Sequence, residues 1–444
     1  TTNGDENVLI GYEAGNDMTT GHRNVVVGYQ AGDKLTSGDR SVAIGYGALG
    51  TEDTGNRSIA IGFNSLTSQN SSSATTGNTA IGVESGFYNE TGISNTLIGY
   101  QTGMGASGQS NSNNTAVGYA ALNVITTGSS NTVIGRLAGD AITSGSSNII
   151  IGDSALGAAT TATLNVAIGG DCMSLVPASV AIQDVVAIGQ NAFKGSASTT
   201  TDADGTVAIG KDSLKALTSG SGNTAVGFES AKSLTTGSFN TALGKQALGL
   251  GSNTGSTNTA IGFQSGMDVT SGVSNTLVGS SSGINLNTGS NNVAIGDTAL
   301  FSATDSANIV AIGIYAGDAI NDSGADGTVA IGRSSLSALT SGASNVAVGY
   351  QSAKNLTTGA SNVSIGYDAM GNSHLGCDKN VIIGKSAFFN GEVDEAVFIG
   401  FNAGGDGTTT TGANGSVGIG KSSLNALTSG SGNTAVGYQS MDAT

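Results

Sequence analysis

The stretch "NVLIGYEAGNDMTTGHR" (residues 7–23) is followed directly by "NVVVGYQAGDKLTSGDR" (residues 24–40). The two are versions of one 17-residue unit, with apolar residues, glycines and a Thr-containing turn at matching positions. A unit this short cannot bury its apolar side chains alone, whereas stacked copies share a continuous core. The repeat therefore predicts a solenoid instead of the two or three ordinary domains that a length of 444 residues would suggest.

The glycine that ends an "xxIG" step marks each copy, and we call it the anchor. The chain holds 25 anchors, and 15 of the 24 intervals between them have the length of the first unit, while the others are slightly shorter or longer. Such spacing indicates a fixed backbone unit with occasional loop insertions. The residues that we select as structural anchors of the repeat are Ile10, Gly11, Val27, Gly28, Ile44, Gly45, Ile209, Gly210, Ile331 and Gly332, together with Asn7, Asn24, Asn223 and Asn345.

The three residues before each anchor have the character of a strand. The residue directly before the anchor is always Ile, Val or Leu, and the residue three before it is always Val, Ile or Thr. Residues branched at Cβ favour strands, and side chains alternate between the two faces of a strand. The residue between them is usually Ala. We expect the Val/Ile face to serve the core of the coil and the Ala face to need a partner.

Asn stands four residues before the anchor in 17 of the 25 copies. Asn starts a strand from a turn well. Stacked copies would also place these amides in a hydrogen-bonded ladder. Both roles stay open at this point.

The rest of the unit predicts a second strand. Every copy has Ala, Ser, Thr or Cys three residues after the anchor, and a bulky residue such as Met18, Leu35 or Leu217 often follows seven after it. "TTG" or "TSG" then closes the unit as a turn, because Gly is free to take positive φ. Two short strands and two turns per unit stack into a parallel β-solenoid.

The fold class that we predict is all-β, a single continuous β-solenoid over residues 1–444 with about 25 coils of about 17 residues. A strand spacing of about 4.8 Å gives a rod on the order of 120 Å long. Both ends fall inside a repeat unit, so we expect the chain to be a segment of a longer array. The 72 Gly with one Pro exclude collagen, and 38% apolar with only 10% charged residues argues against disorder. A net charge of −16 argues against a nucleic-acid partner.

The pattern N-T/V-A-I-G-Y/F-x-A/S-L, closed by T-T-G, resembles the head repeats of YadA-like trimeric adhesins and, more closely, the repeat arrays of bacteriophage tail fibres. The resemblance covers essentially the whole chain. It implies a left-handed parallel β-roll assembled as a parallel homotrimer. YadA-like units are shorter than the unit of this chain, so coil geometry does not transfer directly.

An apolar strand face supports the trimer independently of the resemblance. A thin solenoid would expose the Ala face as an apolar stripe along its whole length, and large exposed apolar patches mark interaction sites. Three chains around an axis would cover it. The alternative is a monomer whose small residues are simply exposed.

Enzyme motifs are weak in this chain, and we expect no enzyme. "GYGALG" (residues 45–50) matches a dinucleotide fingerprint, but it follows from the repeat and lacks a βαβ context. The two histidines, His22 and His374, stand far apart in turns, so no catalytic or metal cluster is indicated. Cys172 and Cys377 are expected to be free thiols.

Two further features have competing interpretations. Asp202, Asp204, Asp322 and Asp326 lie in aligned insertions, where Asp-Gly pairs usually form turns and calcium is the alternative; otherwise we expect no cofactor. The aromatic column directly after the anchor, interrupted by Lys211, Arg333 and Lys385, could bind sugar rings, but aromatic residues more often stack along a sheet.

The function that we expect is a structural segment of a trimeric surface appendage, most of all a bacteriophage tail fibre that acts as a rigid spacer and in host attachment. The alternative is the head of a bacterial trimeric adhesin. The expected partners are two further copies of the chain and a glycan or protein receptor on a host surface, with neither nucleic acid nor membrane insertion. The expected location is the virion or the cell surface. A carbohydrate-active fibre would need paired carboxylates on adjacent coils, and ice binding would need a flat Thr array.

Overall fold

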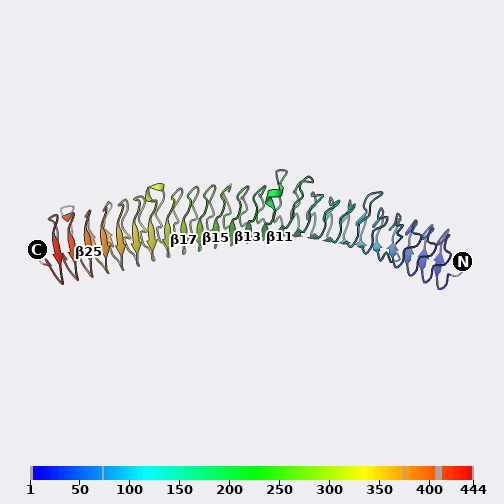
Figure 1. The fold of residues 1–444 in the computed structure, drawn as a ribbon, viewed down its shortest axis with the longest axis horizontal. Helices are drawn as coiled ribbons and strands as arrows, with labels where there is room; N and C mark the ends of the chain where they lie inside the picture. Colours follow the sequence, from blue (N-terminus) through cyan, green and yellow to red (C-terminus); the bar gives the residue numbers. More distant parts are fainter. Residues whose placement is uncertain (1–3, 73–74, 252, 374–375, 406–412, 443–444) are drawn as a thin grey trace. The chain divides into compact units, whose positions relative to one another are not determined.

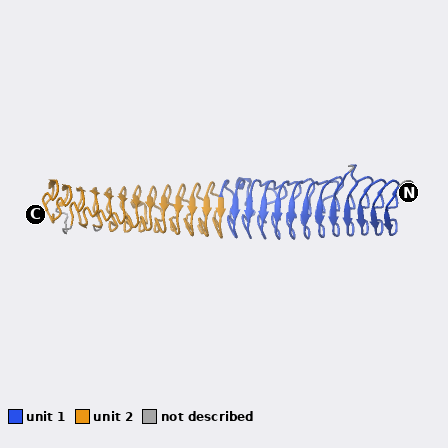
Figure 2. Ribbon diagram, turned by 90° about the horizontal axis from the view of Figure 1, so that it is seen from below, with its two compact units in different colours: residues 1–223 blue, residues 224–444 orange. Residues whose placement is uncertain are grey.

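The computed structural model describes residues 4–72, 75–251, 253–373, 376–405 and 413–442. The chain divides into two compact units, Thr1–Asn223 and Thr224–Thr444 (Figure 2). In each unit the strands of successive coils lie side by side, and an irregular loop joins each strand to the next (Figure 1). The all-β parallel solenoid predicted from the repeat is confirmed, with about 24 turns of about 17 residues and almost no helix. The single continuous domain stays a prediction.

Unit 1 holds twelve three-residue strands and one 3₁₀ turn among its described residues. They are β1 (Val8–Ile10), β2 (Val25–Val27), β3 (Val42–Ile44), β4 (Ile59–Ile61), β5 (Thr79–Ile81), β6 (Thr96–Ile98), β7 (Thr115–Val117), β8 (Thr132–Ile134), β9 (Ile149–Ile151), β10 (Val166–Ile168), β11 (Val186–Ile188), η1 (Thr201–Ala203) and β12 (Val207–Ile209).

Unit 2 repeats this arrangement. Its elements are β13 (Thr224–Val226), β14 (Thr241–Leu243), β15 (Thr259–Ile261), β16 (Thr276–Val278), β17 (Val293–Ile295), β18 (Val310–Ile312), η2 (Ser323–Ala325), β19 (Val329–Ile331), β20 (Val346–Val348), β21 (Val363–Ile365), β22 (Asn372–Ser373), β23 (Val381–Ile383), β24 (Asn390–Gly391), β25 (Val397–Ile399), β26 (Val417–Ile419) and β27 (Thr434–Val436).

The strands pair in parallel and keep a register fixed by the anchor. Val8 lies beside Val25 and Ile10 beside Val27, and the same pairing continues from β5 to β6. Insertions do not disturb it: β11 and β12 pair Val186 with Val207 although an insertion lengthens the segment between them. Extra residues therefore leave the stack as loops and do not shift the strands.

The expected second strand is wrong for most coils. The segment after the anchor forms turns whose backbone bonds the next coil, as in the N–H of Gly32 to the carbonyl of Ala48 (2.9 Å). Among the described residues, a second pair of strands outside the main sheet forms only between β22 and β24, and a few isolated β-bridges occur elsewhere. The physical reason is the backbone of the residues two and four after the anchor, which have positive φ in most coils. Examples are Gln30 (53°) and Leu49 (54°), and a backbone with such angles cannot form an extended strand.

The inward residue of this turn segment is nevertheless part of the core. Leu35 and Leu217 are fully buried and Met18 is 4% exposed, as their spacing predicted. Each coil thus adds one layer to a core that runs along its unit.

Candidate functional site: the outward strand face

The two faces of each strand are the reverse of what we expected. From β2 onward the middle residue points into the coil and is buried, as with Ala80 and Ala167, whereas the residues on either side are half-buried or exposed. Ile98 is 37% exposed and Ile134 is 41% exposed. We call the surface made by the first and third residues of each strand the outward face. Ala is favoured inside because the coil is thin and its interior must also hold a bulky turn residue.

Volume compensation in the core supports this explanation. Where the middle strand residue is large, the residue four after the anchor is commonly Gly, and a Cβ on Gly103 would lie 2.6 Å from Cδ2 of Leu97. Phe398 faces Gly404 in the same way. Where the middle residue is Ala43, the turn supplies Leu49 instead, and both are fully buried. The two positions share one volume, as close-packed interiors require.

The anchor glycine forms the corner at the end of every strand. The selected anchors Gly11, Gly28, Gly45, Gly210 and Gly332 have φ between 129° and 138°. A Cβ on Gly28 would lie 2.5 Å from the carbonyl oxygen of Gly45 in the next coil. The position therefore needs glycine for two reasons, positive φ and the close approach of the neighbouring backbone. The residues before these anchors, Ile10, Val27, Ile44, Ile209 and Ile331, lie on the outward face.

The Asn column forms a hydrogen-bonded stack that we call the amide ladder. Asn131 donates from both its backbone N–H and its Nδ2 to Oδ1 of Asn114, at 3.0 Å each, and its Nδ2 also donates to the carbonyl of Gly145 (2.9 Å). Asn148 repeats the pattern on Asn131. These amides are about 1% exposed or less. Of the selected residues, the backbone N–H of Asn24 donates to Oδ1 of Asn7, and Oδ1 of Asn345 accepts the same two bonds from Asn362. The Nδ2 groups of Asn223 and Asn345 also donate to the turn carbonyl three residues before them.

The ladder has seams, which are pairs of adjacent coils that lack Asn. At one seam of unit 1, Val185 and Thr206 take its place, and η1 lies in the insertion before Thr206. Unit 2 has an equivalent seam with Ile309 and Thr328. The Oγ1 atoms of Thr206 and Thr328 are buried with no hydrogen-bond partner.

Two aspartates of the insertions accept hydrogen bonds from the backbone of the preceding coil, and a third caps its own turn. Oδ1 of Asp204 accepts from the N–H of Gln183 (2.9 Å), and Oδ1 of Asp326 accepts from the N–H of Ala307 (2.8 Å). Asp322 caps η2 by accepting from Gly324, and Asp202 lies in η1. Burial raises the pKa of Asp204, and the neighbouring Asp184 and Asp202 raise it further. The contacts of Asp204 and Asp326 join neighbouring coils, and only that of Asp322 is a local cap. Among the described residues no group of three His, Cys, Asp or Glu side chains could hold a metal.

The aromatic column is a stack of rings along the coils. Tyr12, Tyr29 and Tyr46 stack at centroid distances of 5.1 and 5.2 Å, and Phe63 continues the stack. Lys385 does not interrupt it, because its Nζ lies 5.5 Å from the ring centroid of Tyr367 and 5.9 Å from that of Phe401. Inside these stacks the ring faces lie against neighbouring rings or lysine side chains.

The remaining candidate residues do not converge on one site. The "GYGALG" stretch is β3's corner and turn, and His374 lies outside the described residues. Cys172 and Cys377 are free and buried, and the Sγ of Cys172 donates to the carbonyl of Ala187 (3.2 Å), a role that Ser takes in other coils.

Comparison with known proteins leaves the outward face as the main guide to function. No family model matches the chain, and no curated protein matches it. In the part of the chain that the structure describes, no helix has the length and apolar character needed to span a membrane.

Proposed function

We propose that the chain is a structural segment of a trimeric fibrous surface appendage of the tail-fibre kind. In this role it holds a binding end away from the particle or cell surface and contributes to host attachment, and it carries no enzymatic site. Its location is then the virion or the outside of a cell. The parallel solenoid supports the proposal, because successive coils add length without changing the unit that is stacked.

The outward face is the observation that carries the trimer. None of the three strand positions in any of the 25 coils holds a charged residue, although the chain has 46 charged side chains (15 basic and 31 acidic). Valine, isoleucine and threonine fill most of the outward positions, and all of these positions are half-buried or exposed. Burying such a face against another chain removes apolar area from water and leaves no charge unpaired.

The area of the face suits assembly with copies of the same chain. Each coil adds about 4.8 Å of height, and a three-residue strand is about 10 Å long, so one coil offers about 50 Å². Stable interfaces bury about 800 Å² on each partner, which takes about 16 coils. A second copy presents the same outward residues in the coils of each unit. A left-handed roll with three parallel chains, as the resemblance implies, places these faces toward a common axis.

Substitutions on the outward face test the proposal. Ile98→Glu combined with Ile134→Glu places two carboxylates on the face, and we expect the molar mass in light scattering to fall from three chains to one. The matched control is Val124→Glu combined with Leu175→Glu, at turn positions that are 38% and 49% exposed. The control should keep the mass of three chains. Equal masses for the two double variants would contradict the assignment of the interface.

A further inference from the structure

A row of arginines in unit 1 stands apart from the repeat. Three of the five arginines of the chain, Arg23, Arg40 and Arg57, lie five residues before the anchors of three successive coils. Their φ angles are 62°, 56° and 63°. Most other coils hold Ser, Asn, Thr or Gly at this position. Because a left-handed backbone favours Gly and Asn, the fold itself gives no reason for arginine here.

The guanidinium groups of the second and third arginines form no ion pair among the described residues. Arg23 forms an ion pair with Glu6, with Nε 2.7 Å from Oε2. Arg40 and Arg57 pair with no carboxylate of the residues that the structure describes, and the one contact of the Arg57 guanidinium is a 3.5 Å approach of Nη1 to Oγ1 of Thr75. All three arginines are exposed.

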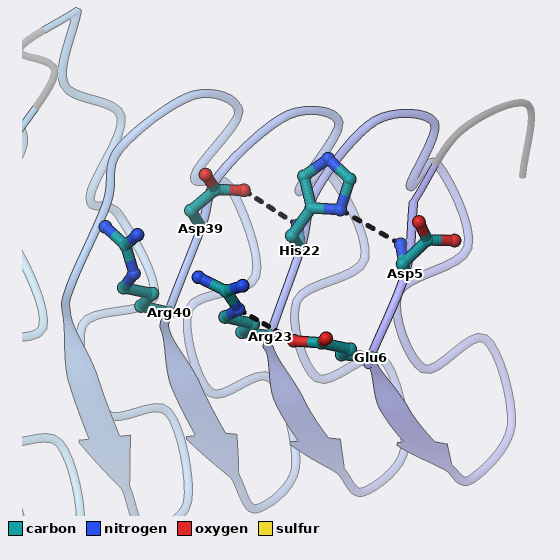
Figure 3. A pocket seen from close by; sticks show the side chains of 6 residues that line it. All are labelled: Asp5, Glu6, His22, Arg23, Asp39 and Arg40. Carbon is teal, nitrogen blue, oxygen red and sulfur yellow. Dashed lines mark hydrogen bonds and ion pairs between the residues drawn. The ribbon is translucent and has the colours of Figure 1, made fainter.

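A polar pocket of about 300 Å³ opens along the row (Figure 3). Glu6, Arg23 and Arg40 line it from below in this view, and a parallel row of Asp5, His22 and Asp39 lines it from above. The residues of the upper row form hydrogen bonds between successive coils. The N–H of Asp5 donates to Nδ1 of His22 (3.1 Å), and the N–H of His22 donates to Oδ1 of Asp39 (2.7 Å).

These bonds define what the pocket offers to a ligand. Since Nδ1 of His22 accepts a hydrogen bond, the neutral ring carries its proton on Nε2 and is one further donor. The guanidinium of Arg40 supplies a planar fork of N–H groups that suits a carboxylate or sulfate. The guanidinium row continues to Arg57 at the coil spacing of about 4.8 Å, which is close to the length of one sugar unit in an extended chain.

We propose that the row Arg23–Arg40–Arg57 binds an anionic polysaccharide that lies along the coils, with about one sugar unit per coil and an acid group on Arg40 or Arg57. The proposal rests on the host-attachment role above and names the class of ligand. A polysaccharide fits better than a nucleic acid, because duplex DNA carries about one charge per 1.7 Å of axis and the chain has a net charge of −16. A sparsely charged sugar chain meets less repulsion from the surrounding carboxylates.

Binding of the full 444-residue chain to immobilised hyaluronan, chondroitin sulfate, neutral dextran and duplex DNA tests the proposal. The variant is Arg40→Asn with Arg57→Asn, since Asn tolerates the left-handed backbone. The control, Arg136→Asn with Arg333→Asn, makes the same change in net charge. We expect hyaluronan or chondroitin sulfate to bind the parent chain and the control, and the variant to bind at least tenfold more weakly. Hyaluronan binding points to carboxylates, and binding of chondroitin sulfate alone points to sulfates.

Four results would overturn the proposal: no binding of either acidic polysaccharide, equal binding by parent and variant, an equal loss in the control, or tighter binding of dextran or DNA. Thermal unfolding of the same samples shows whether the variant is folded, and a variant that unfolds is replaced by Arg40→Gln alone. Light scattering of these samples separates the two proposals, because a chain of trimeric mass that ignores acidic polysaccharides contradicts only the arginine row.

Discussion

The laddered coils from Asn114 to Asn165 and the seam at Val185 and Thr206 have the same strand pairing but different interiors. In the laddered coils every amide is bonded to its neighbours in the stack. At the seam the last amide, Asn165, accepts only the N–H of Val185, and Thr206 leaves a buried hydroxyl unpaired. The strands nevertheless keep their register across the seam. The glycine corners and backbone bonds therefore set the stack, and the ladder adds stability to it.

The largest expected effect compares two glycines. Gly152 is a laddered-coil anchor with φ of 141°, and a Cβ there would lie 2.5 Å from the carbonyl of Gly169; Gly205, in the seam insertion, has φ of 68° and open space. Gly152→Ala should cost about 4 kcal/mol or more through this clash, and Gly205→Ala about 1 kcal/mol through backbone preference alone. Urea unfolding measures both, and similar losses would remove the special role of the corner.

The amide ladder provides the next effect. Asn131→Ala keeps the backbone N–H but removes every hydrogen bond of the side-chain amide, which leaves Asn148 and the carbonyl of Gly145 short of partners. We expect a loss of about 2–4 kcal/mol in the free energy of unfolding. Asn433, half-buried in the last described coil, serves as the control, and Asn433→Ala should cost clearly less. A neutral Asn131→Ala would show that the ladder contributes nothing.

The seam should respond in the opposite direction. Thr206→Val and Thr328→Val each replace an unpaired buried hydroxyl by a methyl group of similar size, so each should stabilise the chain by about 1 kcal/mol. Thr132→Val, on the outward face, is the control and should change little while the chain is monomeric. Destabilisation by the seam substitutions would mean that the hydroxyls are bonded in solution.

A further effect appears only at high pH. Burial raises the pKa of the Cys172 thiol to about 12 and that of Cys377 to about 11. In the unfolded chain a thiol has a pKa of about 8.5, so the folded state favours the neutral thiol; this contribution is complete below about pH 8.5 and is lost as the pH rises toward 11 or 12. Urea midpoints should fall less steeply between pH 9 and 11 in Cys172→Ser than in the parent chain. Parallel pH profiles would contradict a buried neutral thiol.

The sequence predicted the features that every coil shares. The spacing of anchors such as Gly28 was enough to predict the parallel stack and its register. A glycine repeated at each strand end indicates a backbone conformation there that only glycine adopts easily. The predicted orientation of the strand was wrong, because the alternation of side chains alone does not say which face of the strand lies inside the coil. The pairing of Leu97 with Gly103 could have decided it, since a large residue opposite a glycine marks a shared interior.

Other features depend on the backbone and could not be read from residue types. Residues such as Gln30 have no strong preference for positive φ, so the turn after each anchor was mistaken for a strand. The arginine row did leave a signal, three arginines at the interval of the repeat, but its meaning depends on the pocket beside it.

The molar mass of the soluble, folded chain tests the central claim most directly. Light scattering at neutral pH should give three times the 43.2 kDa of one chain, because the outward faces are buried against one another. A mass of 43.2 kDa for the folded chain would contradict the trimer and the role assigned to the outward face.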